Sequence, residues 1–258
     1  MHFQARISAA TWAIQKKENG TWHHGKGGRA IAPGNKGFLK RIHDSAWAWN
    51  LFQGPVYNRL IFKAAADYFD AVISLAGKGA LTRILDVGAG GGVVSLRLAK
   101  ANPDAAVVGI DYALRQVRAA NRLKRKEQVL NCAFQQGNAM ALPFLEASFD
   151  RVVSINSIKH WPDPAQGLSE IRRVLRPRGQ AFISEADRSA SPEELLAFSE
   201  NYRAWYIWGA LMRWILRNVV FGKSYTASEL KTIAGRAGFS DTIIQVAPGP
   251  FFLLVLTK

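Results

Sequence analysis

The chain has 258 residues, of which 48% are hydrophobic and 21% are charged, a balance that excludes an intrinsically disordered protein and allows a sizeable core. Its formal net charge of +15 favours an anionic partner (nucleic acid, a membrane surface or an acidic small molecule), although a solvated basic surface has the same composition. The excess is largest in residues 1–80, with 11 Lys and Arg against 4 Asp and Glu, and in residues 81–190, with 16 against 10. The single cysteine, Cys132, excludes an internal disulfide framework, so we expect a reducing, cytoplasmic location and a buried thiol.

The beginning of the chain is rich in Gly, Pro and Asn, which favours irregular structure. His23 and His24 lie there without a Cys or carboxylate at ligand spacing, so we expect an exposed loop and no metal site. From Ile42 to Ala76 apolar residues recur at helical spacing. We therefore predict an N-terminal extension or lid over residues 1–76, ahead of a domain over residues 77–258.

Within that domain, short apolar runs alternate with helical patterns. Strands are predicted at 83–88, 106–111, 131–139, 149–156 and 179–186, and helices at 91–103, 113–127 and 165–177. This alternation predicts βαβ units and a parallel, doubly wound sheet of the α/β class. The last two apolar runs, 241–248 and 251–258, are joined by a Pro-Gly-Pro turn that only an antiparallel pair can close.

The first predicted strand runs into "DVGAGGG", in which Gly88, Gly90 and Gly92 let the backbone turn sharply and approach a ligand. The following helix is expected to present unpaired N–H groups there. Asp111 ends the second strand about twenty residues on, where a carboxylate accepts hydrogen bonds from ribose hydroxyls. The two motifs together predict adenosine bound across the first two strands.

The spacing argues against a dinucleotide, because Val93 stands where the third glycine of G-x-G-x-x-G belongs. Asp86, two residues before the first glycine, would repel a pyrophosphate. The same acid suits a ligand with a cationic amino acid end, which we expect it to orient.

Four motifs in order, "ILDVGAGGG", "VVGIDYALRQVRAAN", "GNAMALPFLEASFDRVVS" and "HWPDPAQGLSEIRRVLRPRGQAFI", resemble the class I S-adenosylmethionine-dependent methyltransferases. The resemblance is strongest to their UbiE/COQ5-like small-molecule branch. It covers Leu81 to Glu185 closely and extends weakly to the end of the chain. It implies a Rossmann-like, seven-stranded sheet with an antiparallel last strand, and S-adenosylmethionine as cofactor.

The resemblance also assigns residues to the cofactor: Asp86, Gly88, Ala89, Gly90, Gly92, Asp111, Tyr112, Asn138, Ala139 and Tyr57. Tyr112 would pack on the adenine, and Asn138 stands where the family usually has an Asp that meets the adenine amino group. An Asn can accept that bond through its side-chain carbonyl. Tyr57 resembles the tyrosine that covers the methionine end, and it reads equally well as a core aromatic of a helix. Arg178 replaces a glycine of the family's usual turn, a change expected at the surface.

After the fourth strand, Ser154, Asn156 and His160 fall where a parallel sheet delivers side chains to its ligand. We assign Asn156 to the cofactor. His160 is the candidate catalytic base, with pocket shaping as its alternative role. Trp161 is expected to wall the cleft.

Residues 193–222 are expected to form a helical cap over the acceptor pocket. Its aromatic residues alternate with arginines across 203–221, which fits either an aromatic-lined pocket or a basic amphipathic surface resting on a membrane.

The sequence therefore predicts an enzyme that methylates a small, apolar or amphipathic acceptor with S-adenosylmethionine. The alternatives are a methyltransferase that acts on a lipid at the membrane surface, an NAD-dependent oxidoreductase and a non-catalytic relative. The Asn/Asp-Pro-Pro-aromatic motif of nucleic-acid amine methyltransferases does not occur after the fourth strand, so no nucleic-acid partner is expected. The acceptor, the methylated atom and the oligomeric state stay open.

Overall fold

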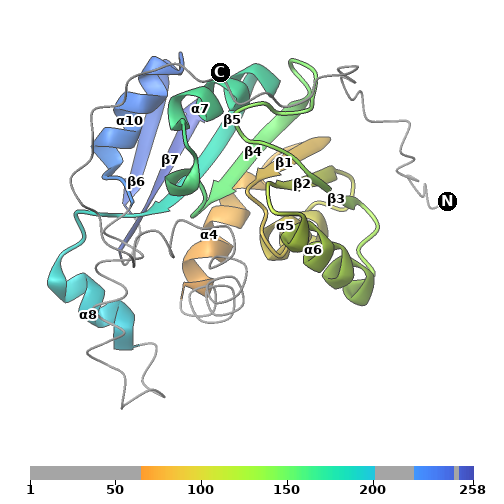
Figure 1. Cartoon of the computed structure of the whole chain (residues 1–258), viewed down its shortest axis with the longest axis horizontal. Coiled ribbons are helices and arrows are strands. Elements are labelled where there is room, and N and C mark those ends of the chain that lie inside the picture. The colour runs from red at the N-terminus through yellow and green to blue at the C-terminus, as the bar shows by residue number, and fades with distance from the viewer. Residues whose placement is uncertain (1–64, 201–223, 247–249) are drawn as a thin grey trace, which may run out of the picture.

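The computed structural model describes residues 65–200, 224–246 and 250–258. Expectations for His23, His24, Tyr57 and the segment 203–221 lie outside these residues. The described part is a single sheet with helices on both faces (Figure 1).

The seven strands are ordered β3-β2-β1-β4-β5-β7-β6 across the sheet. Their bounds are β1 Arg83–Val87, β2 Ala106–Asp111, β3 Cys132–Gln136, β4 Phe149–Ile155, β5 Leu175–Ala186, β6 Asp241–Val246 and β7 Phe251–Thr257. The pairs among β1 to β5 are parallel, whereas β7 is antiparallel to both β5 and β6. The prediction of a doubly wound sheet with an antiparallel last strand is confirmed. The order in which strands are added to the sheet reverses between β1 and β4, and in such sheets a ligand binds at that switch point, beyond the carboxyl ends of the strands.

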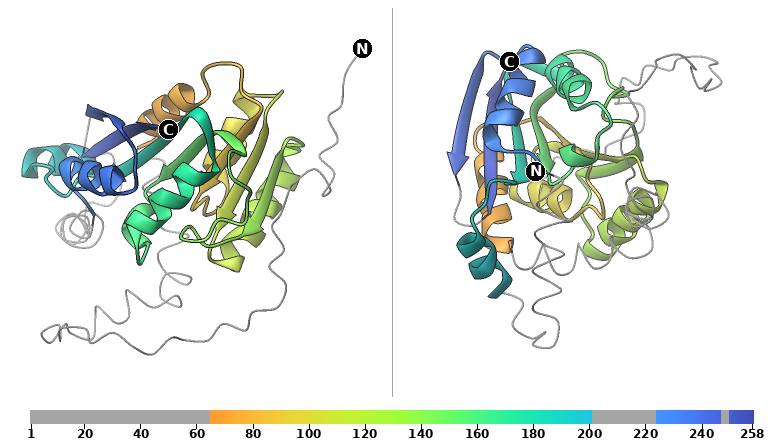
Figure 2. Two further views of the ribbon diagram at one scale, coloured as in Figure 1. Left: turned by 90° about the horizontal axis from the view of Figure 1, so that it is seen from above. Right: turned by 60° about the vertical axis from the view of Figure 1, so that its left-hand side comes forward.

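Helices cover the two faces in separate groups (Figure 2). The elements are α4 Ala66–Ala76, α5 Val93–Ala101, α6 Leu114–Glu127, α7 Pro164–Val174, α8 Pro192–Glu200 and α10 Ala227–Arg236, with a short 3-10 turn η3 at Ile158–His160. Residues of α7 and α10 pack into one buried cluster with the sheet. Residues of α4 and α5 pack into a second cluster on the opposite face, with α6 beside them. The end of the predicted N-terminal extension, α4, therefore shares the core of the sheet.

The helix-to-strand transition at α7 differs from the prediction. The helix ends at Val174 and β5 begins at once with Leu175, four residues before the predicted start. The strand then bends where Arg178 adopts φ of +63°, a left-handed conformation that favours glycine. Its side chain is exposed, as expected for a surface change.

The described Cys132 lies buried in β3 within the second cluster, as predicted. Burial raises the pKa of its thiol to about 12, so it is protonated at neutral pH.

The start of α10 carries a reciprocal cap that generates a stability prediction. The Thr226 hydroxyl accepts from the Glu229 N–H at 3.2 Å, and the Glu229 carboxylate accepts from the Thr226 N–H at 2.9 Å. Thr226→Ala should lower the free energy of unfolding by about 1 kcal/mol, because it leaves a helix-end N–H without its acceptor. Thr232→Ala, in the exposed middle of α10, is the matched control and should change stability by less than about 0.5 kcal/mol. Equal losses in urea unfolding would contradict the cap's contribution.

Candidate active site at the switch point

The glycine loop between β1 and α5 turns through left-handed backbone. Gly88, Gly90 and Gly92 have φ of +79°, +52° and +86°. A Cβ on Gly88 would lie 1.9 Å from the Ser157 hydroxyl oxygen, so no larger residue fits there. A Cβ on Gly90 would meet no atom within 4 Å, so this residue borders open space. The loop therefore has the close packing on one side and the open side that a bound ligand needs.

Four N–H groups of the loop itself have acceptors within the protein, so they are not among the unpaired donors expected at the start of the following helix. The N–H groups of Gly88 and Ala89 donate to the Ile110 carbonyl at 2.9 and 2.8 Å, and that of Gly92 donates to the Ala89 carbonyl. The N–H of Gly90 donates to Asp111. The sharp turn folds the loop back onto the end of β2, which uses these donors inside the protein.

Asp111 joins the end of β2 to the loop. One carboxylate oxygen accepts from the Gly90 N–H at 2.9 Å and the other from the Ala113 N–H at 2.8 Å. Burial raises the pKa of this carboxyl, and the two backbone donors oppose that shift. A carboxylate has about four acceptor positions, so lone pairs remain for two hydroxyls of a ribose.

Asp86 does not open onto the ligand side. Its residue is 2% exposed, and its carboxylate accepts from the Ser95 hydroxyl of α5 at 2.6 Å. Burial raises the pKa of the carboxyl to about 7, and nearby Asp111 adds to the increase. Asp86 is therefore placed beneath the loop and can act on a cationic ligand only through the field across it.

The residues expected around the adenine lie at the neighbouring strand ends. Tyr112 is 75% exposed, which leaves its ring open to stack on a base. The Asn138 side-chain oxygen already accepts from the Met140 N–H at 3.0 Å and has one further lone pair to offer. Ala139 follows in the same turn, half-buried against the first core cluster.

The segment after β4 is fixed to the rest of the protein at several points. Ser157 contacts Gly88, and its hydroxyl accepts from the Trp161 indole N–H at 3.1 Å. Trp161 in turn packs so closely on Gly167 that a Cβ there would lie 2.4 Å from the ring. Ser154, expected on the ligand side, is instead buried in the sheet and donates to the Val87 carbonyl at 2.9 Å.

Asn156 is the most informative polar group in this segment. It is 7% exposed and has φ of +53°, a strained conformation for a residue other than glycine. Neither its side-chain oxygen nor its nitrogen has a hydrogen-bond partner. Buried amides left without partners cost free energy, so an orphaned pair beside the glycine loop indicates a place for polar groups of a ligand.

Sequence reasoning missed a buried ion pair at the same strand ends. The Lys159 ammonium lies 2.8 Å from a carboxylate oxygen of Glu185, and the two side chains are 3% and 0% exposed. Glu185 also accepts from the Ala186 N–H at 3.0 Å. The pair attaches η3 to the end of β5, while His160, the last residue of η3, keeps an exposed side chain. Only the packing of two distant segments shows this pairing.

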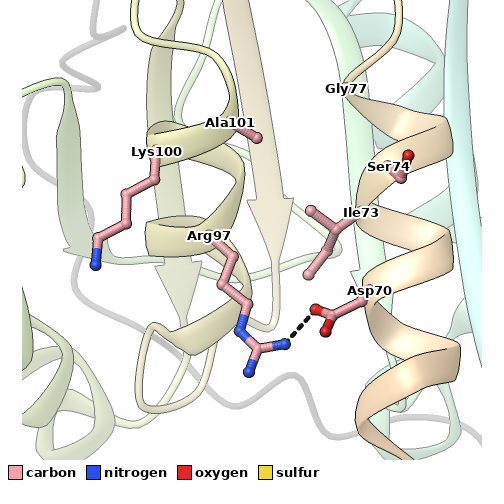
Figure 3. A pocket seen from close by; sticks show the side chains of 7 residues that line it. All are labelled: Asp70, Ile73, Ser74, Gly77, Arg97, Lys100 and Ala101. Carbon is pink, nitrogen blue, oxygen red and sulfur yellow. Dashed lines mark hydrogen bonds and ion pairs between the residues drawn. The ribbon is translucent and has the colours of Figure 1, made fainter.

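A groove of about 560 Å³ lies between α4 and α5 (Figure 3). Arg97 reaches across it to pair with Asp70, while Lys100 points away from α4 and pairs with Glu127 of α6. The groove extends to the last turns of both helices, near Gly77, at the opposite end from the glycine loop. It is therefore separate from the candidate site.

The described residues contain no group of three or more His, Cys, Asp and Glu side chains able to hold a metal ion. None of their helices combines the length and apolar character needed to cross a bilayer.

Residues 78–238 match the family described as "Methyltransferase domain". The chain belongs to the class I S-adenosylmethionine-dependent methyltransferases.

Named relatives of this methyltransferase place it in the UbiE-like branch. It is 33% identical over 163 residues to 27-O-demethylrifamycin SV methyltransferase of Amycolatopsis mediterranei, covering 62% of this chain and 60% of the relative. It is also 33% identical over 150 residues to demethylmenaquinone methyltransferase of Thermus thermophilus, covering 58% and 66%. The methyltransferase thus spans less than two thirds of the length of either relative.

Solved structures show the same fold. A putative S-adenosyl-L-methionine-dependent methyltransferase from Methanococcus maripaludis superimposes with a TM-score of 0.63 at 18% identity, covering 89% of this chain and 97% of that one. A putative O-methyltransferase from Nostoc punctiforme gives a TM-score of 0.59 at 21% identity, covering 76% and 57%.

The burial of Asp86 generates a pH-dependent stability prediction. Because its pKa lies near 7 in the folded methyltransferase and near 3.8 ordinarily, the folded state holds the proton more tightly. The free energy of unfolding should therefore fall as pH rises from about 4 to about 7, and level off above. Asp86→Asn, which keeps an acceptor for Ser95, should reduce the stability difference between about pH 5 and about pH 8 by roughly 2–3 kcal/mol. Asp104→Asn, an exposed control, should leave the difference unchanged, and a pH profile of Asp86→Asn identical to that of the parent chain would contradict the assignment.

Proposed function

We propose that this chain transfers the methyl group of S-adenosylmethionine to a small, apolar or amphipathic acceptor. The observation that carries the proposal is the hydrogen bond from Gly90 to Asp111, which holds a carboxylate beside a loop bordering open space. Asn156 directly precedes Ser157, the residue that contacts the loop, and its buried amide has no hydrogen-bond partner. This amide supports a polar ligand at the same place.

The described residues fit this cofactor in distinct roles. Asp111 would accept from the ribose hydroxyls and Tyr112 would stack on the adenine. Asn138 would meet the adenine amino group through its remaining lone pair. Ala89 and the loop glycines would let the backbone approach, and Asn156 would bond the amino acid end. Ala139 would adjoin the adenine, and Asp86 would act from beneath the loop in its ionised form. Tyr57, which lies outside the described residues, would cover the methionine end.

Bound S-adenosylmethionine supplies an electrophilic methyl group for an in-line displacement. The chain contributes alignment, exclusion of water and, for a protonated acceptor, a group that takes the proton. His160 is exposed at the end of a segment that Ser157, Trp161 and the Lys159–Glu185 pair fix in place. The fixed backbone confines the imidazole to the region beside these strand ends. His160 is therefore our candidate base.

The acceptor class comes from the relatives and from the sequence. The named relatives act on demethylmenaquinone and on a demethylrifamycin, both small molecules with large apolar parts. The aromatic residues of the cap expected over residues 193–222 would suit such an acceptor. We place the protein in the cytoplasm. The alternative is an enzyme that methylates a lipid at the membrane surface, which it contacts through residues 203–221. A division into an extension over 1–76 and a catalytic domain over 77–258 stays part of the proposal.

The cofactor assignment is tested by Asp111→Ala. Loss of a charged acceptor for ribose hydroxyls should weaken binding of S-adenosylhomocysteine by about tenfold or more, measured by calorimetry. Asp104→Ala, in the exposed loop before β2, is the matched control and should leave affinity unchanged. Equal affinity of Asp111→Ala and the parent chain would sink the assignment, and tighter binding of NAD than of S-adenosylhomocysteine would favour the oxidoreductase alternative.

The role of His160 is tested once an acceptor is turned over. His160→Ala should lower kcat by roughly 10²–10⁴-fold with little change in cofactor affinity, because a positioned base contributes about that factor. His160→Gln, which keeps a polar side chain but cannot take up the proton, should lose kcat to a similar extent. A loss under about threefold, or one confined to KM, would assign His160 to pocket shaping.

A further inference from the structure

The outer face of α6 carries a continuous cationic stripe. The stripe is formed by Arg115, Arg118, Arg122, Arg125 and Lys126, all exposed. Their spacing of three, four, three and one residues keeps them within an arc of about 100° and along about 16 Å of helix. The opposite face packs Val117 and Ala120 against the sheet. The cations therefore all project from one side of the molecule.

These cations lack the ion pairs that several other cations of the described residues make. Three examples of such ion pairs are Arg97–Asp70, Lys100–Glu127 and Arg176–Asp150. No ion pair joins any member of the stripe to a carboxylate of the residues that the structure describes. Five like charges on one helix face repel one another, so an anionic surface laid against them would relieve that repulsion.

Exposed aliphatic side chains flank the stripe at both ends. Leu114 in the first turn is 43% exposed, and Leu130, just past the last turn, is 74% exposed. Aliphatic groups gain nothing beside a phosphodiester backbone, whereas they gain free energy when they enter the acyl region below lipid headgroups. The combination of cations and leucines favours an anionic bilayer over a nucleic acid.

The position of α6 connects this surface to the candidate site. The helix begins directly after Asp111 and Tyr112, at the same edge of the sheet as the glycine loop. It lies on the outside of the molecule along the β3 edge (Figure 1). We propose that α6 docks the protein on anionic lipid surfaces through this stripe and its two leucines, so that an apolar acceptor can be taken up from the bilayer. The uptake rests on the proposed function, whereas the docking stands on the surface alone.

The docking is measured by co-sedimentation of the full chain with vesicles. We expect binding to phosphatidylcholine vesicles that contain about 30% phosphatidylserine and little binding to phosphatidylcholine alone. Binding should weaken when salt is raised from about 0.05 M to about 0.5 M, because the headgroup charges are then screened.

The stripe itself is tested by the triple variant R118E, R122E and R125E. Each cation near an anionic leaflet raises partitioning by about fivefold, so the variant should bind at least about a hundredfold more weakly. A matched triple reversal at exposed cations elsewhere, K78E, K231E and R236E, carries the same net charge and should lose less than about tenfold.

The contribution of the leucines is measured separately. Leu130→Ser should lower binding to the anionic vesicles at high salt as well as at low salt, because apolar insertion is not screened. Equal binding of Leu130→Ser and the parent chain at high salt would remove the leucine from the docking surface.

Three results would overturn the docking. The parent chain could fail to bind anionic vesicles, the two triple variants could lose binding equally, or the stripe variant could keep vesicle binding while losing binding to a single-stranded RNA oligonucleotide. Affinity for S-adenosylhomocysteine separates this from the proposed function. A chain that binds S-adenosylhomocysteine but not vesicles contradicts only the docking, and one that binds vesicles but not S-adenosylhomocysteine contradicts only the methyltransferase site.

Discussion

The close approach of Gly88 to Ser157 is the constraint on which the candidate site depends. It joins the turn after β1 to the segment after β4. These two segments meet at the switch point of the sheet. A Cβ at position 88 would overlap the serine hydroxyl, and the left-handed backbone there excludes most other residues as well. Because the cofactor loop and the segment that carries His160 are in contact, displacing either one displaces the other.

Buried polar groups around this contact reduce stability in exchange for fixed geometry. Asp86 is buried with only Ser95 as its side-chain donor, Asn156 has no partner, and the Lys159–Glu185 pair removes two charges from water. A hydrophobic core would fold with less penalty at all three places. Their clustering near the carboxyl ends of β1, β4 and β5 indicates that this edge of the sheet serves binding.

The predictions from sequence were right for features that depend on the local residue pattern and missed features that depend on tertiary contacts. The alternation of strand and helix patterns predicted the parallel sheet, and the short Pro-Gly-Pro connection predicted its antiparallel end. Both signals can be read within one segment, because hydrophobic period and connection length are local features of the sequence. The early start of β5 at Leu175 came from pairing with Phe149, and the Lys159–Glu185 pair came from strands that neighbour only in space. The same limit applies to the N–H groups of Gly88, Ala89 and Gly90, whose acceptors lie at the end of β2.

The distribution of charge reconciles a strongly basic chain with a small-molecule reaction. The proposed cofactor site at Asp86, Asp111 and polar amides has no need of a charge of +15, and Lys159 beside it is neutralised by Glu185. Part of the excess positive charge lies on α6, on the face that points away from the core. The first turn of this helix borders the candidate site. Positive charge on α6 cannot raise the affinity for a cofactor that is itself cationic. It can orient the molecule, because unpaired cations on one side turn that side, and with it the edge of the candidate site, toward an anionic plane.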